Sequence, residues 1–410
     1  IEWIGEIPDS WKLVRFKDIC VNKKEIAGES SENYERLALT LGGVIKRPKY
    51  DSDGLQPKEF DGYQIICEND FIFKMIDLQN ISTSRVGLSP YCGLVSPAYI
   101  RFSSREEGQY NEYVYYFLMS MYYNCVYNNL GGNGVRSALN ATDIGQLVIP
   151  FPAIEKQKKI VAFLENAFKK IDNLIEVQQA QIDKLKEYKQ SVITEAVTKG
   201  LDPTVPMKDS GVEWIGMIPC EWEIRRGKNV VDLLNKPVYN TDDVITCFRD
   251  GEVTLRKNRR EEGFTFSDKE IGYQGIDVGD LVIHGMDGFA GAIGISDSRG
   301  KGSPVLIVLD SKQNKKFLKY YLRSLAYRDI FLALSTGIRV RSCDLRWNKI
   351  STLPFLIPSL EEQYGIVKYI EKRLYDIDKL IAIKQAKIDK LQEYKKSLIY
   401  EYVTGKKEIV

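Results

Sequence analysis

One twenty-residue segment occurs twice in this sequence, and the repeat constrains the fold more than any other feature. Gln179–Thr198 reads QAQIDKLKEYKQSVITEAVT and Gln385–Thr404 reads QAKIDKLQEYKKSLIYEYVT, so 14 of 20 aligned positions are identical. Each copy closes a long helical pattern that follows a different globular segment. A chain of 410 residues is too large for one ordinary core. The sequence therefore predicts two similar halves, each ending in a long helix.

A second repeated motif opens each half. The pattern W-I-G-x-I-P-x-x-W spans Trp3–Trp11 and returns at Trp214–Trp222, although the chain has only five tryptophans. Packing of Trp and Ile, a turn at Gly and a fixed φ at Pro favour a structural clip. Because Gly211 and Val212 precede the second copy, we expect a few residues to precede Ile1 in the natural chain.

The segments between the repeats combine strands, turns and one aromatic helix each. Phe71–Phe73 and Leu281–Ile283 are short apolar runs after turn residues, which predicts buried strands. Tyr113–Tyr123 and Phe317–Tyr327 are predicted to be helices. Their pairs of adjacent tyrosines, Tyr115-Tyr116 and Tyr320-Tyr321, are aligned with each other.

The two long helical stretches are predicted to form an antiparallel coiled coil. Apolar residues recur in steps of four and three from Ile171 to Ala196 and from Ile377 to Tyr402, which is a heptad pattern. If the second globular segment is compact with its ends close together, the second helix starts where the first stops and runs back. The polar seam positions Gln178 and Lys384 either fix the register or extend to solvent from the seam edge.

These patterns predict an α+β fold with an internal pseudo-two-fold repeat. Two similar mixed α/β globular domains are separated by the long antiparallel two-helix coiled coil. The expected domain ranges are 1–150 for the first globular domain, 151–200 for the first spacer helix, 201–355 for the second globular domain and 356–410 for the second spacer helix.

The apolar stripe of the helices is wider than two helices need. Leu174, Ile193, Leu380 and Ile399 flank the seam. Extra apolar flanks indicate further helices from elsewhere, so these residues are predicted to contact a partner subunit. The alternative is that the globular domains of the same chain cover them.

Several classes of enzyme site are excluded by the sequence. His284 is the only histidine, so neither a His-based triad nor a multi-His metal site is available. Gly294–Ser303 resembles a phosphate-binding loop but has the wrong spacing and lacks its Ser or Thr. The seven cysteines form no C-x-x-C pair, which predicts reduced thiols in a cytoplasmic protein. No apolar run is long enough to span a membrane, and no metal or cofactor is expected.

Local basic loops are the candidates for binding a polyanion, because the net charge is only +2. Arginine forks bind guanine edges and phosphates, and lysine binds phosphate, when small neighbours permit close approach. The alternative for any single run is an ordinary solvated loop. The predicted DNA-binding residues are Lys46, Arg47, Lys49, Arg136, Arg256, Lys257, Arg259, Arg260, Arg339 and Arg341, with Arg136 and Arg341 at matching places in the two halves.

Together, the W-I-G-x-I-P-x-x-W motif, the P-x-x-E-x-Q start of each long helix after Pro152 and Pro358, and the I-D-K-L-x-E-Y-K repeat resemble the specificity subunits of type I restriction–modification enzymes. The resemblance covers essentially the whole chain. It implies a non-catalytic subunit whose two recognition domains each bind one half of a split double-stranded DNA target.

The same resemblance implies partners. Two methyltransferase subunits would pack on the helices and domains, with two ATP-dependent restriction subunits beyond them. A scaffold that binds only proteins, with incidental basic loops, and an enzyme with a cryptic methyltransferase site stay open as alternatives. DNA affinity that falls steeply with salt would distinguish a DNA-binding subunit from a scaffold.

Overall fold

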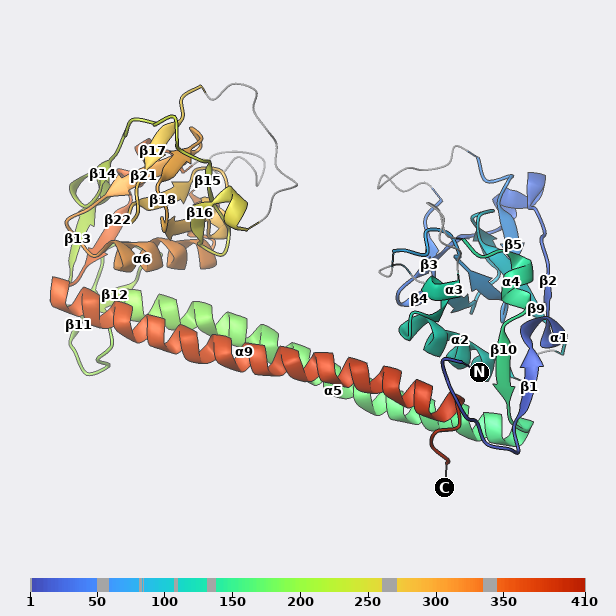
Figure 1. Ribbon diagram of the computed structural model, residues 1–410. Helices are drawn as coiled ribbons and strands as arrows, with labels where there is room; N and C mark the ends of the chain where they lie inside the picture. Colours follow the sequence, from blue (N-terminus) through green and yellow to red (C-terminus); the bar gives the residue numbers. More distant parts are fainter. Residues whose placement is uncertain are drawn as a thin grey trace. The chain divides into compact units, whose positions relative to one another are not determined.

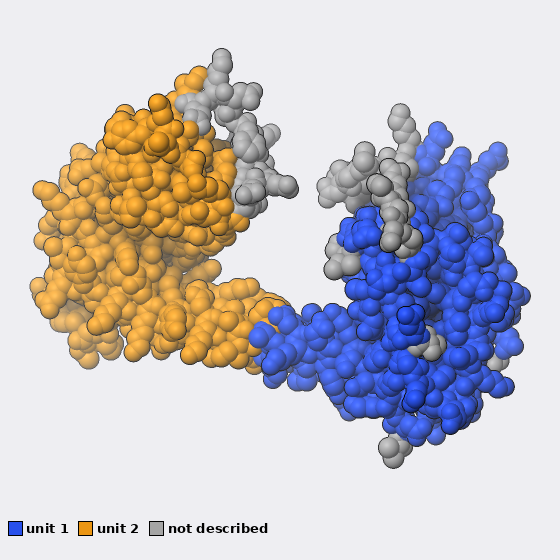
Figure 2. Space-filling model, in the orientation of Figure 1, with its two compact units in different colours: residues 1–178, 386–410 blue, residues 179–385 orange. Residues whose placement is uncertain are grey.

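The structure, a computed structural model, describes residues 2–49, 59–80, 83, 85–106, 110–130, 138–259, 271–334 and 345–409. It divides into two compact units (Figure 2). Unit 1 comprises Ile1–Gln178 with Ala386–Val410, and unit 2 comprises Gln179–Gln385. The long helices α5 (Ile154–Lys199) and α9 (Leu360–Val403) lie within the ranges 151–200 and 356–410 predicted for them. Each unit therefore contains one globular domain and a part of both helices.

The recognition domain of unit 1 is built mostly from short strands (Figure 1). Its elements are β1 (Lys12–Arg15), α1 (Phe16–Ile19), β2 (Cys20–Asn22), η1 (Gly28–Asn33), β3 (Arg36–Thr40), β4 (Gly43–Arg47), β5 (Gln64–Ile66), β6 (Phe71–Phe73), β7 (Val86–Leu88), β8 (Gly93–Val95), β9 (Ile100–Ser104), α2 (Asn111–Tyr123), α3 (Val126–Leu130), α4 (Ala141–Gly145) and β10 (Val148–Phe151). They form two four-stranded sheets, β2-β9-β6-β7 and β4-β3-β8-β5, and the antiparallel pair β1-β10.

Unit 2 repeats part of this arrangement. Its elements are β11 (Met207–Asp209), β12 (Met217–Pro219), β13 (Glu223–Arg226), η2 (Gly227–Asn229), β14 (Asp232–Leu233), β15 (Ile245–Cys247), β16 (Val253–Leu255), η3 (Arg256–Asn258), β17 (Gln274–Ile276), β18 (Leu281–His284), η4 (Gly288–Ala290), β19 (Ile293–Ile295), β20 (Gly300–Gly302), β21 (Leu306–Asp310), α6 (Lys315–Tyr327), α7 (Ile330–Ala333), α8 (Trp347–Ile350) and β22 (Pro354–Ile357). The sheet β14-β21-β18-β19 corresponds to β2-β9-β6-β7, and the pair β13-β22 corresponds to β1-β10.

The predicted buried strands and aromatic helices are confirmed. Phe71–Phe73 is strand β6, and the predicted strand at Leu281 is β18. In unit 1, Phe16 lies on Phe71 and Phe102, with ring centroids 5.5 and 4.9 Å apart. Aromatic contacts of this kind add to the free energy gained by burial. This core includes residues of α2 and packs that helix against the sheet β2-β9-β6-β7.

The sequence alignment of Tyr115-Tyr116 with Tyr320-Tyr321 is wrong by one residue. The structure aligns α2 with α6 in a different register. Helices α2 and α6 both have 13 residues, and Ser120 and Ser324 occupy the same position with no exposed surface. The residues two positions beyond the helices, Cys125 and Asp329, both have positive φ. The structural counterparts of Tyr115 and Tyr116 are therefore Lys319 and Tyr320.

Each tryptophan motif contacts the end of a long helix, as expected for a structural clip. In unit 1, Trp3 contacts Tyr400 of α9, with ring centroids 6.1 Å apart. Gly405 follows that helix with φ +74°, and a Cβ there would lie 2.4 Å from Pro8 Cδ. In unit 2, Trp222 donates a hydrogen bond from Nε1 to Glu362 at 3.0 Å. The motif thus joins each domain to the coiled coil.

Within unit 1 the two helices run antiparallel. The rings of Phe163 and Tyr402 lie 4.4 Å apart, and the Lys395 ammonium lies 2.8 Å from the Asp172 carboxylate. As the residue number rises along α5, that of its contact on α9 falls. Ile171 is buried at a predicted seam position.

The helices are also antiparallel within unit 2. Lys189 pairs with Asp378 at 2.6 Å, and Lys384 donates to Gln181 at 2.5 Å. The pairs Lys189–Asp378 and Lys395–Asp172 are repeat equivalents. Of the two polar seam positions, Gln178 is buried and Lys384 is half-buried. Lys384 therefore bridges the helices, as a register-fixing residue would.

The four flanking apolar residues differ in exposure. Leu174 and Leu380 are 45% and 47% exposed, whereas Ile193 and Ile399 are 3% and 5% exposed. Ile193 belongs to the core of unit 2 and Ile399 to that of unit 1. For this second pair the domains of the chain itself cover the flank, because the ends of the helices pack under them. Of these four residues, Leu174 and Leu380 are the two with extensively exposed side chains.

Candidate nucleic-acid interface

The predicted basic residues of unit 1 lie on or beside the β3–β4 hairpin. Lys46 is exposed on β4 and pairs with Glu35 at 2.5 Å, and this hydrogen bond raises the pKa of Lys46. Arg47 is exposed at the end of the same strand. Lys49 instead donates to the Ser31 carbonyl at 2.8 Å, and only 13% of its side chain is exposed. Lys46 and Arg47 are therefore accessible to a polyanion. Lys49 instead connects the end of the hairpin to η1 through its hydrogen bond to Ser31.

The predicted basic residues of unit 2 follow the β15–β16 hairpin. Arg256 and Lys257 lie in η3, and Lys257 pairs with Asp243 at 2.5 Å. Arg259 pairs with Asp250 at 2.6 Å and lies 4.2 Å from the Phe248 ring centroid. Its hydrogen bond to Asp250 raises the pKa of Arg259 and lowers that of the carboxyl. A phosphate would have to compete with these carboxylates.

Four of the predicted DNA-binding residues lie outside the described residues. They are Arg136, Arg260, Arg339 and Arg341. The two domains thus present different described basic surfaces, a strand hairpin in unit 1 and a short helical turn in unit 2.

Other titratable groups have structural surroundings. His284 accepts a hydrogen bond at Nδ1 from the Asp287 amide at 3.0 Å, and burial lowers its pKa. Burial raises the pKa of the Cys20 and Cys247 thiols to about 12, which disfavours the thiolate nucleophile. Among the described residues, no group of three or more His, Cys, Asp or Glu side chains could hold a metal ion. None of the described helices is long and apolar enough to cross a membrane.

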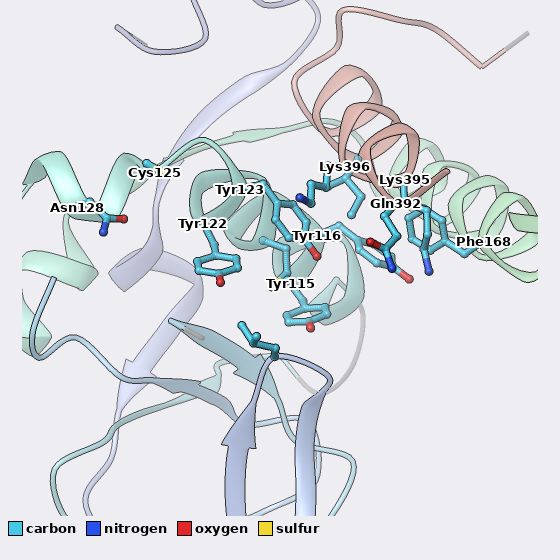
Figure 3. Close-up of a pocket in the computed structure, with 13 residues that line it drawn as sticks. Tyr115, Tyr116, Tyr122, Tyr123, Cys125, Asn128, Phe168, Gln392, Lys395 and Lys396 are labelled. Carbon is cyan, nitrogen blue, oxygen red and sulfur yellow. The ribbon is translucent and has the colours of Figure 1, made fainter. Parts of the chain in front are cut away.

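The structure has two pockets beside the coiled coil that the sequence did not predict. The aromatic pocket, in unit 1, has a volume of about 720 Å³ and lies between α2, α5 and α9. Figure 3 shows Tyr123 of α2 next to Lys396 of α9, whose ammonium lies 5.6 Å from the Tyr123 ring centroid, and Tyr116 on the side of Phe168 of α5. Burial raises the pKa of Tyr116 to about 12.

The cationic pocket, in unit 2, has a volume of about 710 Å³ and lies between α6, α5 and α9. Lys319 and Arg323 of α6 and Lys189 of α5 line it. Burial lowers the pKa of Lys319 to about 8. Comparing α2 with α6 at the correct register would have revealed these cations, since they replace Tyr115 and Met119.

The comparisons with known proteins agree on one family. The model of the type I restriction modification DNA specificity domain matches residues 8–187. Two proteins of Methanocaldococcus jannaschii, named as the MjaX and MjaVIII type I restriction enzyme specificity subunits, are 25% and 24% identical to this chain. Each alignment covers 98% of this chain, with 95% and 93% of the relatives. By these matches, this chain is similar to the specificity subunits of type I restriction–modification enzymes.

Solved structures share the fold of this chain. One chain comes from a study of complex assembly and conformational transition in a type I restriction–modification system. It has a TM-score of 0.67 at 15% identity, with 98% of this chain and 99% of that chain covered. The HsdS subunit of Thermoanaerobacter tengcongensis has a TM-score of 0.50 at 14% identity, with 98% of both chains covered. The predicted fold class is thereby confirmed. By family, the specificity subunit is a non-catalytic component.

Proposed function

We propose that this specificity subunit binds a split, asymmetric double-stranded DNA target, one half to each recognition domain. The observation that carries the proposal is the repeated scaffold with unlike basic surfaces. The sheets β2-β9-β6-β7 and β14-β21-β18-β19 correspond strand for strand. On this shared scaffold, Lys46 and Arg47 lie on a long hairpin, whereas Lys257 and Arg259 follow a short one. Different surfaces on equivalent domains favour different half-sites.

The surface ion pairs are compatible with this role. Lys46–Glu35 and Lys257–Asp243 are solvent-exposed pairs, and such pairs contribute only about 0–1 kcal/mol. A DNA phosphate can therefore replace the carboxylate at small cost. The carboxylates also repel phosphates, so a basic residue adds affinity only where the DNA geometry suits it. Arg136, Arg260, Arg339 and Arg341 remain proposed contacts on the same argument from charge and sequence position.

The coiled coil has the surface expected for two copies of one partner. Leu174 and Val177 are exposed on α5 in unit 1, and their repeat equivalents Leu380 and Ile383 are exposed on α9 in unit 2. Their exposed fractions are 45%, 50%, 47% and 59% in that order. Matched apolar patches on a polar helix surface favour docking of two methyltransferase subunits. Two ATP-dependent restriction subunits would then join the complex through these partners.

The half-site proposal is tested with the assembled methyltransferase complex and a library of DNA targets. Lys46→Ala with Arg47→Ala should relax one half-site and leave the other intact, as sequencing of methylated sites would show. Lys257→Ala is the matched variant for the second half-site. Equal loss at both half-sites in either variant would contradict independent reading by the two domains.

A salt titration separates this function from a protein-binding scaffold. The observed DNA affinity should fall steeply and linearly on a logarithmic scale as salt rises, because phosphate contacts release counterions. Affinity that is absent, or independent of salt and sequence, would favour the scaffold. Methyl transfer by the chain without any partner subunit would favour the cryptic enzyme instead.

A further inference from the structure

The aromatic and cationic pockets are repeat equivalents. Residues of α2 and α6 that line them match at the same helix positions, as Tyr116 with Tyr320 and Tyr123 with Tyr327. On the coiled coil, three lining positions also correspond through the repeat: Phe168 with Leu374, Lys395 with Lys189, and Ile399 with Ile193. Both pockets thus combine two tyrosines, a lysine and an apolar floor at corresponding positions. Each lies within a single compact unit.

The side chains that line the two pockets differ in charge at two equivalent positions of α2 and α6. Lys319 and Arg323 in the cationic pocket stand where the aromatic pocket has Tyr115 and Met119. A pocket that only filled space between packed elements would not need two cations. Moreover, desolvating a cation costs free energy unless a counter-charge is present.

Although Asp250, which pairs with Arg259, lines the same pocket, neither cation forms an ion pair with a carboxylate in the described part of the chain. Lys319 makes no hydrogen bond or ion pair there, and its ammonium lies 3.9 Å from the Tyr320 ring centroid. Arg323 donates to the Tyr327 hydroxyl and the Gly291 carbonyl, at 2.8 and 3.1 Å, and pairs with no described carboxylate. By contrast, Lys189 on the coiled coil is neutralised by Asp378. The described lining thus has more cations (Lys186, Lys189, Arg249, Lys319 and Arg323) than carboxylates (Asp250 and Asp329), so the pocket carries a net positive charge.

The aromatic pocket has polar groups of another kind, the hydroxyls of its tyrosines. The hydroxyls of Tyr115, Tyr116, Tyr122 and Tyr123 make no hydrogen bond with any described residue. Both Lys395 and Lys396 already have carboxylate neighbours, Asp172 and Glu393. Tyrosine-rich concave surfaces of this kind bind partner side chains, with the rings as contact area and the hydroxyls as donors.

We propose that the two pockets bind the same segment of the methyltransferase partner, one copy in each, and that Lys319 and Arg323 bind a carboxylate of that segment. This inference rests on the proposed function, which supplies a partner in two copies. The segment carries an apolar side chain, which enters between the tyrosine pair and the apolar floor, beside an acidic residue. In unit 1 the tyrosine hydroxyls donate to the same acidic residue. The two docking sites therefore lie at equivalent positions. Partner affinity should depend more strongly on salt at the cationic pocket, where it includes a charge pair, than at the aromatic pocket.

The test uses the full chain and the methyltransferase subunit of the same system, mixed at rising salt and analysed by native mass spectrometry. Lys319→Met keeps the length of the side chain and removes its charge. The loss of a desolvated charge pair should weaken one of the two partner-binding steps by at least about tenfold. At partner concentrations that give two bound copies for the wild type, the variant should hold one.

Lys316→Met is the matched control. Lys316 is also on α6, but its pair with Glu371 is exposed, with side chains 53% and 43% accessible. Its replacement should leave both binding steps within about threefold, because exposed pairs contribute little.

The outcomes separate the inference from the proposed function. If the wild type binds two partners and both variants do so equally well, the pocket inference is overturned and the proposed function stands. If Lys319→Met keeps both partners but loses DNA affinity in a mobility shift, the pocket binds phosphate and the inference is again overturned. If the wild type binds no methyltransferase subunit, the proposed function itself fails.

Discussion

Asp70 and Arg101 form a buried ion pair in unit 1, and it offers a direct test of how this domain is stabilised. Arg101 Nε donates to Asp70 at 2.6 Å, and each side chain is only 5% exposed. Asp70 also accepts hydrogen bonds at 2.6 Å from the Ser103 hydroxyl and the Cys67 amide. The carboxylate thus joins β6 and β9 to the turn after β5.

Asp70→Ala would leave Arg101 buried beside a cavity, with the Ile65 carbonyl and Glu25 as its remaining oxygen partners. Removing one member of a buried pair costs about 3–5 kcal/mol. Since about 1.4 kcal/mol corresponds to a factor of ten, local opening should become at least about 100-fold more frequent. Glu35→Ala removes the exposed Lys46 pair and should cost about 0–1 kcal/mol.

Hydrogen exchange followed by mass spectrometry measures this effect locally. The amides of β6 and β9 should lose about two or more powers of ten in protection in Asp70→Ala, whereas Glu35→Ala should change them little. Strand β18 of unit 2 serves as the internal reference. A loss in β6 below about tenfold, comparable to that in the control, would refute the reasoning that the buried pair stabilises this domain.

Three further predictions concern the helices and the sheets. Gly405→Ala should lower the free energy of unfolding in urea more than Gly211→Ala does. Both glycines have positive φ, and a side chain in this left-handed backbone costs about 1–2 kcal/mol, but only at Gly405 would a Cβ meet Pro8. Equal effects would show that the tryptophan motif does not constrain the end of the helix. Insertion of one heptad after Gln178 and another after Gln385 lengthens the coiled coil by roughly 10 Å. It should widen the gap between half-sites by about three base pairs with both half-sites retained, and an unchanged gap in the methylated sites would exclude the helices as spacers. Diamide, a two-electron oxidant, should link Cys67 to Cys92, since Ile66 pairs with Gly93 in the antiparallel register of β5 and β8 and the two exposed cysteines directly flank this pair. Peptide mapping should lose the crosslink in Cys92→Ser, and its absence in the wild type would contradict this geometry.

The sequence by itself determined the features that are encoded by local periodicity. The heptad pattern predicted both long helices, and the apolar runs predicted β6 and β18. The antiparallel direction followed from connectivity, and Lys189–Asp378 and Lys395–Asp172 show it within each unit. Such features depend on neighbours three, four or two residues away, so a single sequence contains them.

Only the tertiary structure decided which residues are accessible and which charges are compensated. Ile193 and Ile399 have the same sequence pattern as Leu174 and Leu380, yet the domains cover the first pair and leave the second exposed. Lys49 belongs to a basic run in the sequence, but its ammonium donates a hydrogen bond to the Ser31 carbonyl in η1. Burial and ion pairing depend on residues far apart in the chain, and no local pattern specifies them.

The same reason explains the pockets. Lys319 and Arg323 lie in an ordinary amphipathic helix by sequence, and a one-residue shift in the alignment of α2 with α6 concealed that they replace Tyr115 and Met119. The packing of α6 against the coiled coil places both cations in one cavity whose described lining has more cations than carboxylates. The repeat thus determined that two equivalent sites exist, and tertiary packing gave each site its own charge, because charge compensation depends on which distant side chains meet.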